Sequence, residues 1–214
     1  MTLLEAQEIV AAHAPGPYYA TDYRAWEDEY LARVCAVVEG LPPGRVLDIG
    51  PGWGTMMTWL AGNGWQVEVC DFIPLGHWIT PALLDLARAQ FHQRDIFMGP
   101  LAVGAYDLVL MTQVLTHLKF RPDEVIATCR EMLKPGGKLL ASVFKGDQAI
   151  TQAPFGDDWR AVPQYGSAPA VPDMVSHIYT LESFRDLLTT SFPAADVWQP
   201  EGSPVMFGLC ERER

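Results

Sequence analysis

The sequence predicts an α/β fold built on a doubly wound, mostly parallel sheet. From residue 45 onward, short apolar runs rich in β-formers alternate with segments of helical periodicity. Strands and helices that alternate in this way predict a parallel sheet with helices on both faces. A glycine-rich turn follows the first of these strands, and two strands joined by a short turn end the chain.

The first 40 residues precede this alternation and predict an N-terminal helical cap over 1–40. A helix is expected over 2–14, because Thr2 and Glu5 have the spacing of a capping box. A second helix is expected over 22–39. Its apolar face consists of Trp26, Tyr30, Val34, Val37 and Val38.

The alternating part of the chain has short strands that helices separate. The strands are expected over 45–49, 66–72, 91–96, 106–111 and 138–144. The helices are expected over 55–62, 80–89 and 122–133. Lys134-Pro-Gly-Gly137 ends the last of these helices, because proline and glycine do not continue it.

Residues 146–178 break the rhythm and are rich in Pro, Gly, Asp and aromatic residues. A long segment of this kind in a compact domain is usually functional, and we interpret it as an inserted substrate lid. A helix over 180–190 and strands over 196–199 and 205–211 then complete a seven-stranded sheet. The short Pro-Gly-Ser-Pro connection makes the last two strands antiparallel, and the last strand is expected to insert antiparallel into the sheet. We expect one domain over 1–214.

Composition and charge narrow the function. Of the 214 residues, 49% are hydrophobic and 19% are charged, as in ordinary globular proteins. The net charge is −11, with no cluster of Lys or Arg, so nucleic acid is not an expected partner. No apolar run is long enough to cross a membrane, and the first residues do not have the pattern of a secretory signal. We therefore expect a cytoplasmic protein that binds no membrane.

The four cysteines are widely spaced within apolar stretches, and none forms a CxxC pair or a Cys/His cluster. They are Cys35, Cys70, Cys129 and Cys210. This spacing favours buried free thiols over a zinc site or a disulfide framework. No metal site is expected.

The most informative stretch is Val46-Leu-Asp-Ile-Gly-Pro-Gly-Trp-Gly54, an apolar strand that runs into a glycine-rich turn and a helix. Glycine lets backbone N–H groups approach a ligand closely, and open α/β sheets bind ligands at the carboxyl ends of their strands. A dinucleotide fingerprint requires a third glycine at position 55, where this chain has Thr55. The spacing is instead GxGxG, with Asp48 two residues before it.

These residues resemble motif I of the class I S-adenosylmethionine-dependent methyltransferases, and the resemblance extends over roughly residues 18–210. Several further pieces follow in order and with similar spacing. They are Val67-Glu-Val-Cys-Asp-Phe72, Arg94-Asp95-Ile96, Tyr106-Asp-Leu-Val-Leu-Met-Thr112 and Leu133-Lys-Pro-Gly-Gly-Lys138. The resemblance implies a Rossmann-like methyltransferase fold and S-adenosyl-L-methionine as the cofactor.

The resemblance also implies how that cofactor is held. Asp71 binds the ribose diol and Asp95 the adenine amino group, through hydrogen bonds that carboxylates accept. Asp48 and the backbone of the glycine turn line the methionine end. The remaining implied cofactor contacts are Gly50, Pro51 and Gly52 in the turn, Phe72 and Ile96 on either side of adenine, and Thr112 and Gln113 beside the methionine moiety.

The acceptor side is harder to assign, because methyl transfer needs a base only when the acceptor arrives protonated. The candidate catalytic residues are His117, after the fourth strand, and His177, at the end of the lid. The stretch around His117 resembles ubiquinone-type O-methyltransferases, whose members have acids beside the histidine. Gln113 and Thr116 stand at those places here, which removes the metal ligands. A structural role for His117 stays an alternative.

Aromatic residues of the lid and of the N-terminal segment are expected to close the acceptor site. The lid carries Phe155, Trp159 and Tyr165, with Asp157 and Asp158 beside them, and the N-terminal segment carries Tyr18, Tyr19, Tyr23 and Trp26. Tyr18 and Tyr19 follow Pro17 on a loop, so we interpret Tyr19 as a ligand contact. We interpret Trp26 and Tyr30 as packing residues.

The leading prediction is methyl transfer to an O, N or C atom of a small, partly apolar molecule, with O- or N-methylation first. Two alternatives stay open. One is a relative of the same fold that transfers another group from the cofactor, and the other is a non-catalytic module that binds the cofactor. A homodimer is a further possibility.

Overall fold

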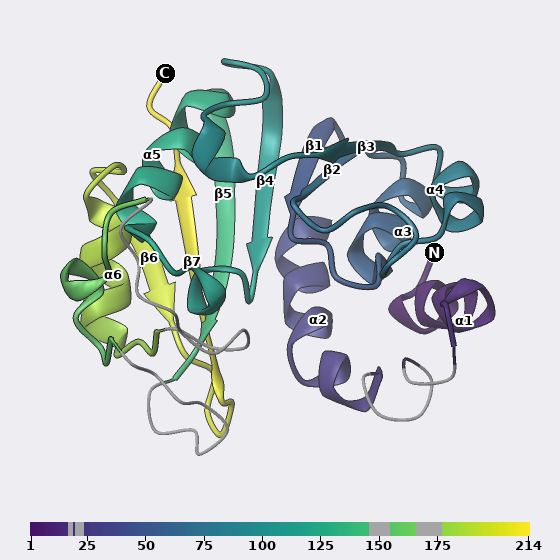
Figure 1. Ribbon diagram of the computed structural model, residues 1–214, viewed down its shortest axis with the longest axis horizontal. Coiled ribbons are helices and arrows are strands. Elements are labelled where there is room, and N and C mark those ends of the chain that lie inside the picture. The colour runs from purple at the N-terminus through teal and green to yellow at the C-terminus, as the bar shows by residue number, and fades with distance from the viewer. Residues whose placement is uncertain (17–18, 20–23, 146–154, 166–176) are drawn as a thin grey trace. The chain divides into compact units, whose positions relative to one another are not determined.

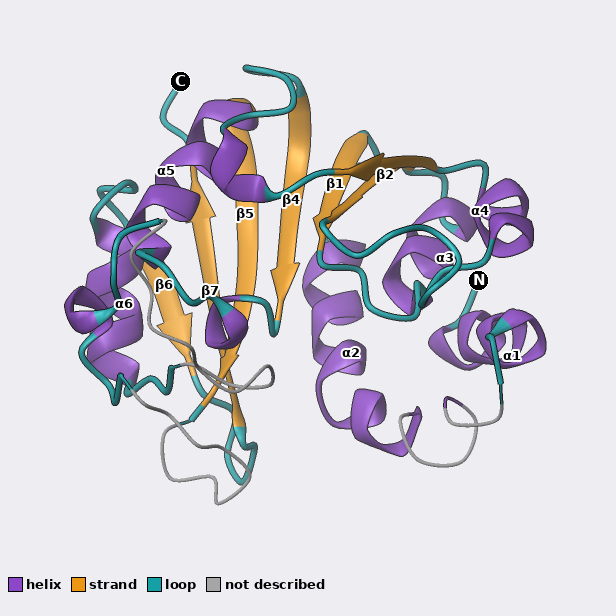
Figure 2. Ribbon diagram, in the orientation of Figure 1, coloured by secondary structure: helices purple, strands orange, loops and turns teal. Residues whose placement is uncertain are grey.

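The computed structural model describes residues 1–16, 19, 24–145, 155–165 and 177–214. Its residues form two compact units, a first unit from Met1 to Asp95 and a second unit from Ile96 to Arg214. Each unit contains strands with helices packed on them (Figures 1 and 2). The prediction of one domain over 1–214 stays a prediction.

The first unit contains three parallel strands in the order β3-β2-β1. These are β1 (Arg45–Ile49), β2 (Gln66–Asp71) and β3 (Gln90–Gln93). Its helices are α1 (Leu3–His13), α2 (Arg24–Glu39), α3 (Thr55–Gly62) and α4 (Pro81–Ala87). Helix α1 packs against α2, α3 and α4, so the N-terminal residues belong to the body of this unit.

The second unit contains four strands in the order β4-β5-β7-β6. These are β4 (Tyr106–Thr112), β5 (Leu133–Phe144), β6 (Ala195–Trp198) and β7 (Val205–Glu211). Helices α5 (Pro122–Met132) and α6 (Leu181–Thr189) contact one another and pack on these strands (Figure 1). Three short 3-10 helices complete the described part of this unit: η2 (Ile96–Met98), η3 (Leu115–His117) and η4 (Trp159–Ala161).

The predicted fold class is confirmed. The sheet has seven strands in the order β3-β2-β1-β4-β5-β7-β6, and β7 runs antiparallel to β5 and β6. The capping box of Thr2 with Glu5 opens α1 as expected. All four cysteines are buried, and none of them forms a disulfide within the described residues. Among the described helices, none has both the length and the apolar character needed to cross a bilayer.

Most predicted boundaries lie within two residues of the observed ones, and two strand boundaries differ by more. Strand β5 begins at Leu133 and not at 138, because Gly136 donates its N–H to the carbonyl of Arg212 (2.7 Å) and Arg212 donates its N–H to Gly137 (2.9 Å). Strand β3 ends at Gln93 and not at 96, since η2 begins at Ile96. The predicted lid over 146–178 falls mostly outside the described residues, as do Tyr18 and Tyr23.

The close packing of α6 on β7 depends on Gly208, and we predict that Gly208→Ala destabilises the protein. A Cβ at Gly208 would lie 2.3 Å from Cδ1 of Leu188 and 3.2 Å from Cζ of Phe184, both fully buried. Overpacking of this kind costs about 1–3 kcal/mol. Urea denaturation of the variant measures the loss.

Gly40→Ala is the matched control. Its Cβ would meet only the carbonyl oxygen of Val37, at an ordinary 3.4 Å. We expect the control to leave the unfolding midpoint nearly unchanged. Equal unfolding midpoints for Gly208→Ala and wild type would contradict the prediction, because they would show that the packing of α6 on β7 tolerates a Cβ at position 208.

Candidate functional site

The glycine turn after β1 has the backbone geometry that its sequence predicts. Gly50, Gly52 and Gly54 have φ angles of 63°, 55° and 86°, a region that residues with a Cβ rarely adopt. Gly50 donates its N–H to the carbonyl of Cys70 (2.9 Å), and Gly54 donates to Pro51 (3.0 Å). These bonds tie the turn to the end of β2 and leave the N–H of Gly52 without a partner among the described residues.

Asp48 is the most unusual group of the first unit. It lies in β1 and is fully buried, and neither of its carboxylate oxygens has a hydrogen-bond partner in the part of the chain that the structure describes. Burial, with a smaller effect from the charge of Asp71, raises the pKa of Asp48 to about 8. A buried carboxylate without donors is costly, so this group fits a ligand that brings N–H or O–H donors or a positive charge.

Asp71 and Asp95 follow the ends of the two neighbouring strands. Asp71 ends β2 and accepts the N–H of Ile73 (2.9 Å) on one carboxylate oxygen. Burial raises the pKa of Asp71 and the backbone bonds oppose that rise. Arg94, next to Asp95, donates its N–H to the carbonyl of Asp71 (2.8 Å), so these two segments are adjacent. Phe72 is 71% exposed, a large apolar surface for a residue beside the half-buried Asp71.

The first unit also holds two functional candidates that the sequence reasoning missed, Glu27 and Thr55. Tyr19 is fully buried, and its hydroxyl donates to Glu27 (2.8 Å) and lies 2.8 Å from the Thr55 hydroxyl. The Tyr19 hydroxyl is thus held within this unit, and its predicted contact with the cofactor stays a prediction. Nothing in the sequence indicates a functional role for Glu27 or Thr55, because a glutamate among other charged residues is typical of the solvent-exposed face of a helix.

In the second unit, Thr112 ends β4 and Gln113 follows it in a left-handed conformation, with φ of 60°. The N–H of Gln113 donates to the carbonyl of Ser142 (3.0 Å), and its side-chain amide donates to the Ser142 hydroxyl (3.0 Å). Its side-chain oxygen is buried without a partner. A non-glycine residue held with positive φ and a free acceptor is typical of a ligand site. Ile96, at the start of this unit, is only 7% exposed.

The structure separates the two candidate histidines of the second unit. His117 lies in η3 and is exposed. His177 is fully buried, and neither ring nitrogen has a hydrogen-bond partner among the residues that the structure describes. Its backbone N–H donates to the carbonyl of Thr116 (3.2 Å), and the Thr116 hydroxyl donates to the carbonyl of Gln113 (3.0 Å). His177 therefore belongs to the group of residues that follows β4.

Two further polar groups near this segment are buried without partners, the Tyr179 hydroxyl and Nε1 of Trp159. The rings of Tyr179 and His177 meet edge to face with centroids 4.1 Å apart. Tyr179 forms a bridge with Lys145, directly after β5. Burial lowers the pKa of His177 to about 4, although Asp157 and Asp158 oppose this, so the imidazole is neutral at neutral pH.

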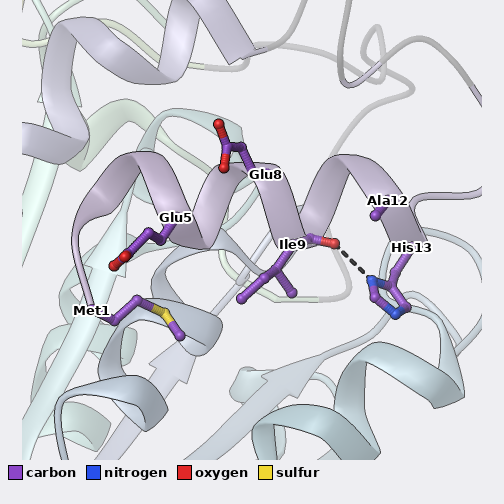
Figure 3. Close-up of a pocket in the computed structure, with 6 residues that line it drawn as sticks. All are labelled: Met1, Glu5, Glu8, Ile9, Ala12 and His13. Atoms are coloured by element: carbon purple, nitrogen blue, oxygen red, sulfur yellow. Dashed lines mark hydrogen bonds between the residues drawn. The ribbon is translucent and has the colours of Figure 1, made fainter.

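A surface pocket runs along α1 (Figure 3). It is lined by Met1, Glu5, Glu8, Ile9, Ala12 and His13. Within it, Nδ1 of His13 donates to the carbonyl of Ile9 (2.7 Å). None of the predicted site residues lines this pocket, so we give it no part in the reaction. Within the described part of the chain, no three His, Cys, Asp or Glu side chains are grouped as metal ligands would be.

Comparison with solved structures agrees with this fold. The structure of Burkholderia thailandensis 1,6-didemethyltoxoflavin-N1-methyltransferase, with bound 1,6-didemethyltoxoflavin and S-adenosylhomocysteine, superposes with a TM-score of 0.64 at 17% sequence identity. The match covers 99% of this chain and 88% of that chain. The chain therefore has the Rossmann-like methyltransferase fold. The chain belongs to the family described as "Methyltransferase domain", whose sequence profile matches residues 22–191.

The sequence relatives act on different kinds of acceptor. The chain is 27% identical over 177 residues to the ubiquinone/menaquinone biosynthesis C-methyltransferase UbiE of Acidiphilium cryptum, covering 76% of this chain and 66% of that protein. It is 31% identical over 149 residues to the ribosomal RNA small subunit methyltransferase C of Alcanivorax borkumensis, covering 64% and 43%. The chain therefore spans less than two thirds of each. By their names one acts on a quinone pathway and one on RNA, so the family does not fix the acceptor.

We predict that Asp48→Asn flattens the dependence of stability on pH. Asp48 in the folded protein keeps its proton up to a pKa of about 8, whereas an aspartate in the unfolded chain loses it near the ordinary pKa of 3.8. Between these values the folded state binds more protons, so this group makes stability fall as pH rises. Urea denaturation of the ligand-free protein at pH 5 and pH 8 measures the difference.

Asp107→Asn is the control for a carboxylate that has a partner. Asp107 accepts two bonds from Nζ of Lys134, at 2.9 and 2.7 Å, and is partly exposed. We expect Asp107→Asn to keep the wild-type dependence of stability on pH between pH 5 and pH 8. If Asp48→Asn also kept the wild-type dependence of stability on pH, Asp48 would be ionised in the folded protein at neutral pH. The interpretation of Asp48 as a protonated acid would then be wrong.

Proposed function

We propose that the chain transfers the methyl group of S-adenosylmethionine to an oxygen or nitrogen of a small molecule. The observation that carries the proposal is the fully buried Asp48 carboxyl group just before the glycine turn. Within the described residues its two oxygens have no hydrogen-bond partner, and neither has the N–H of Gly52. A ligand with an ammonium and hydroxyl groups, and without phosphate, supplies what these groups lack.

In this proposal the residues of the first unit hold most of the cofactor. Asp48 and the backbone of Gly50, Pro51 and Gly52 line the methionine end. Asp71 uses its remaining acceptor capacity on the ribose diol, and Asp95 binds the adenine amino group. The apolar contacts of adenine are Phe72 and Ile96, and the further contacts of the methionine moiety are Thr112 and Gln113. The exposed ring of Phe72 and the unpartnered oxygen of Gln113 support these assignments.

On the acceptor side, we assign the role of base to His177 and not to His117. The bound cofactor supplies a methyl group activated on a sulfonium. His177 is neutral at neutral pH because its pKa is low, so one ring nitrogen is free to accept a proton from an acceptor hydroxyl or amine. With the cofactor bound, that nitrogen would take the proton of the acceptor atom as the atom bonds to the methyl carbon and the carbon–sulfur bond breaks, which releases S-adenosylhomocysteine. A buried site without water helps this step by aligning the two reactants.

The acceptor we propose is a small molecule and not nucleic acid. The net charge of −11 opposes phosphate backbones, although one relative is named for ribosomal RNA. Aromatic residues near the acceptor side favour a partly apolar or aromatic acceptor. Phe97, Phe120 and Tyr165 form one such cluster in the second unit, with centroids 4.7 to 5.4 Å apart. We place the reaction in the cytoplasm, and a homodimer remains part of the proposal.

We predict that the protein converts S-adenosylmethionine to S-adenosylhomocysteine in the presence of an acceptor from a panel of phenols, hydroxyquinones and nitrogen heterocycles. A cofactor with a deuterated methyl group marks the product for mass spectrometry. His177→Asn should lower kcat about 100-fold or more for an acceptor that arrives protonated, since that is the usual contribution of a general base.

His117→Asn is the matched control, because it replaces the exposed histidine of the same group of residues. We expect it to change kcat little. Raising the pH should partly rescue His177→Asn, since the acceptor then loses its proton to water. Tight binding of S-adenosylhomocysteine with no product across the panel would favour a non-catalytic module, and failure to bind it would refute the proposed function.

A further inference from the structure

We propose that Glu27 is a positioning residue for the cofactor site, which fixes the glycine turn by binding Tyr19 and Thr55 at once. The three side chains form a closed cluster in the first unit, which we call the Glu27 cluster. This inference deepens the proposed function and rests on it for the identity of the ligand. The geometry of the cluster itself comes from the first unit alone.

The three oxygens of the Glu27 cluster form a triangle. Tyr19 donates its hydroxyl to Oε2 of Glu27 at 2.8 Å, and Thr55 donates its hydroxyl to the same oxygen at 2.8 Å. The two hydroxyl oxygens lie 2.8 Å from one another. The residues are 0%, 3% and 1% exposed for Tyr19, Glu27 and Thr55. Bonds between buried groups are not exchanged for bonds to water, so the cluster holds its geometry strongly.

The cluster acts on the glycine turn from its C-terminal end. Thr55 is the first residue of α3 and directly follows Gly54, the last glycine of the turn, whose φ is 86°. The Tyr19 ring also packs on Trp53 inside the turn, with centroids 5.7 Å apart, and Trp53 packs on Trp78 at 4.8 Å. Tyr19 therefore holds residues 53 and 55 together, one through its ring and one through its hydroxyl.

A fixed turn matters because three glycines in left-handed conformations have many alternatives when nothing restrains them. Thr58 fastens the same place from within α3, since its hydroxyl and its N–H both bind the carbonyl of Gly54, at 2.8 and 2.9 Å. With Gly54 and Thr55 fixed, the free N–H of Gly52 and the side chain of Asp48 keep their places before the ligand arrives. Preorganisation of this kind raises affinity by removing a cost of ordering.

The chemistry of Glu27 suits this role better than a structural role alone. A carboxylate oxygen accepts two hydroxyl donors at one atom, and an ionised carboxylate brings no donor of its own. The carboxyl also lies at the N-terminus of α3, where negative charge is favoured. Burial raises the pKa of Glu27 to about 7, which the bonds from Tyr19 and Thr55 oppose.

Glu68 provides a matched comparison within the first unit. It is also a buried glutamate, 4% exposed, and it also has two partners, with Nε of Arg45 at 2.6 Å and Nε2 of His92 at 2.8 Å. Glu68 lies in the first half of β2, away from the carboxyl end of that strand. Loss of its charge therefore weakens the unit without touching the glycine turn.

The experiment compares Glu27→Leu, Glu27→Gln and Glu68→Gln with wild type by two measurements. Calorimetry with S-adenosylhomocysteine gives the Kd, and hydrogen exchange with mass spectrometry gives the protection of backbone amides over 50–58. We expect Glu27→Leu to raise the Kd about tenfold or more and to speed exchange over 50–58, since a small misplacement of a site has effects of this size. Glu27→Gln keeps an acceptor oxygen and should stay within about threefold of wild type.

Glu68→Gln should lower the melting temperature while leaving both the Kd and the exchange over 50–58 unchanged. Unchanged exchange in Glu27→Leu would overturn the proposal, and so would equal effects of Glu27→Leu and Glu68→Gln. If Glu27→Leu does not fold, Tyr19→Phe makes the same test, because it removes one donor and keeps the ring on Trp53. If wild type does not bind the nucleoside, the proposed function fails, and the exchange measurement still decides the role of Glu27.

Discussion

The burial of Asp48 is the constraint on which the rest of the candidate site depends. Strand β1 is covered on both faces, with Val46, Leu47 and Ile49 nearly or fully buried, so an acid in this strand cannot reach water. The neighbouring strand provides no donor, since Asp48 stands beside Val69 in the parallel register. A parallel sheet thus carries a carboxyl group into a dry place at the end of a strand, where the cost of burial is recovered only when a ligand brings donors.

Much of the fold could be predicted from the sequence, because local patterns and tertiary packing agree in it. Strand β1, helix α3 and strand β7 have the predicted bounds, each marked by apolar runs and by glycine or proline at the ends. Strand β5 shows where the pattern failed. Pro135 and two glycines are typical of a turn, yet the segment pairs with residues after β7, and no local signal reports a partner 75 residues away.

The parts of the site that could be predicted are those whose residue types have few other uses, namely the glycine turn and the acids at strand ends. Glu27 could not be found in this way, since on α2 it stands between Arg24 and Asp28 and its burial depends on Tyr19, from a different segment. Tyr179 was missed for the opposite reason. An aromatic residue just before a helix is typical of an ordinary core residue. The structure is needed to show that the Tyr179 hydroxyl is buried without a partner among the described residues.

The unpartnered polar groups that surround the two candidate ligand sites differ in kind. In the first unit the described group is an acid, Asp48, which suits a ligand that brings positive charge. In the second unit, the segments that follow β4 and β5 contain neutral groups without a described partner: the Gln113 oxygen, the His177 ring and the Tyr179 hydroxyl. A hydroxyl and a neutral imidazole can each donate and accept hydrogen bonds, and the amide oxygen accepts them, so this second set suits an uncharged ligand with polar groups. Because an uncharged group costs less to bury than an ion, the fold keeps this second set dry at a lower cost than it keeps Asp48.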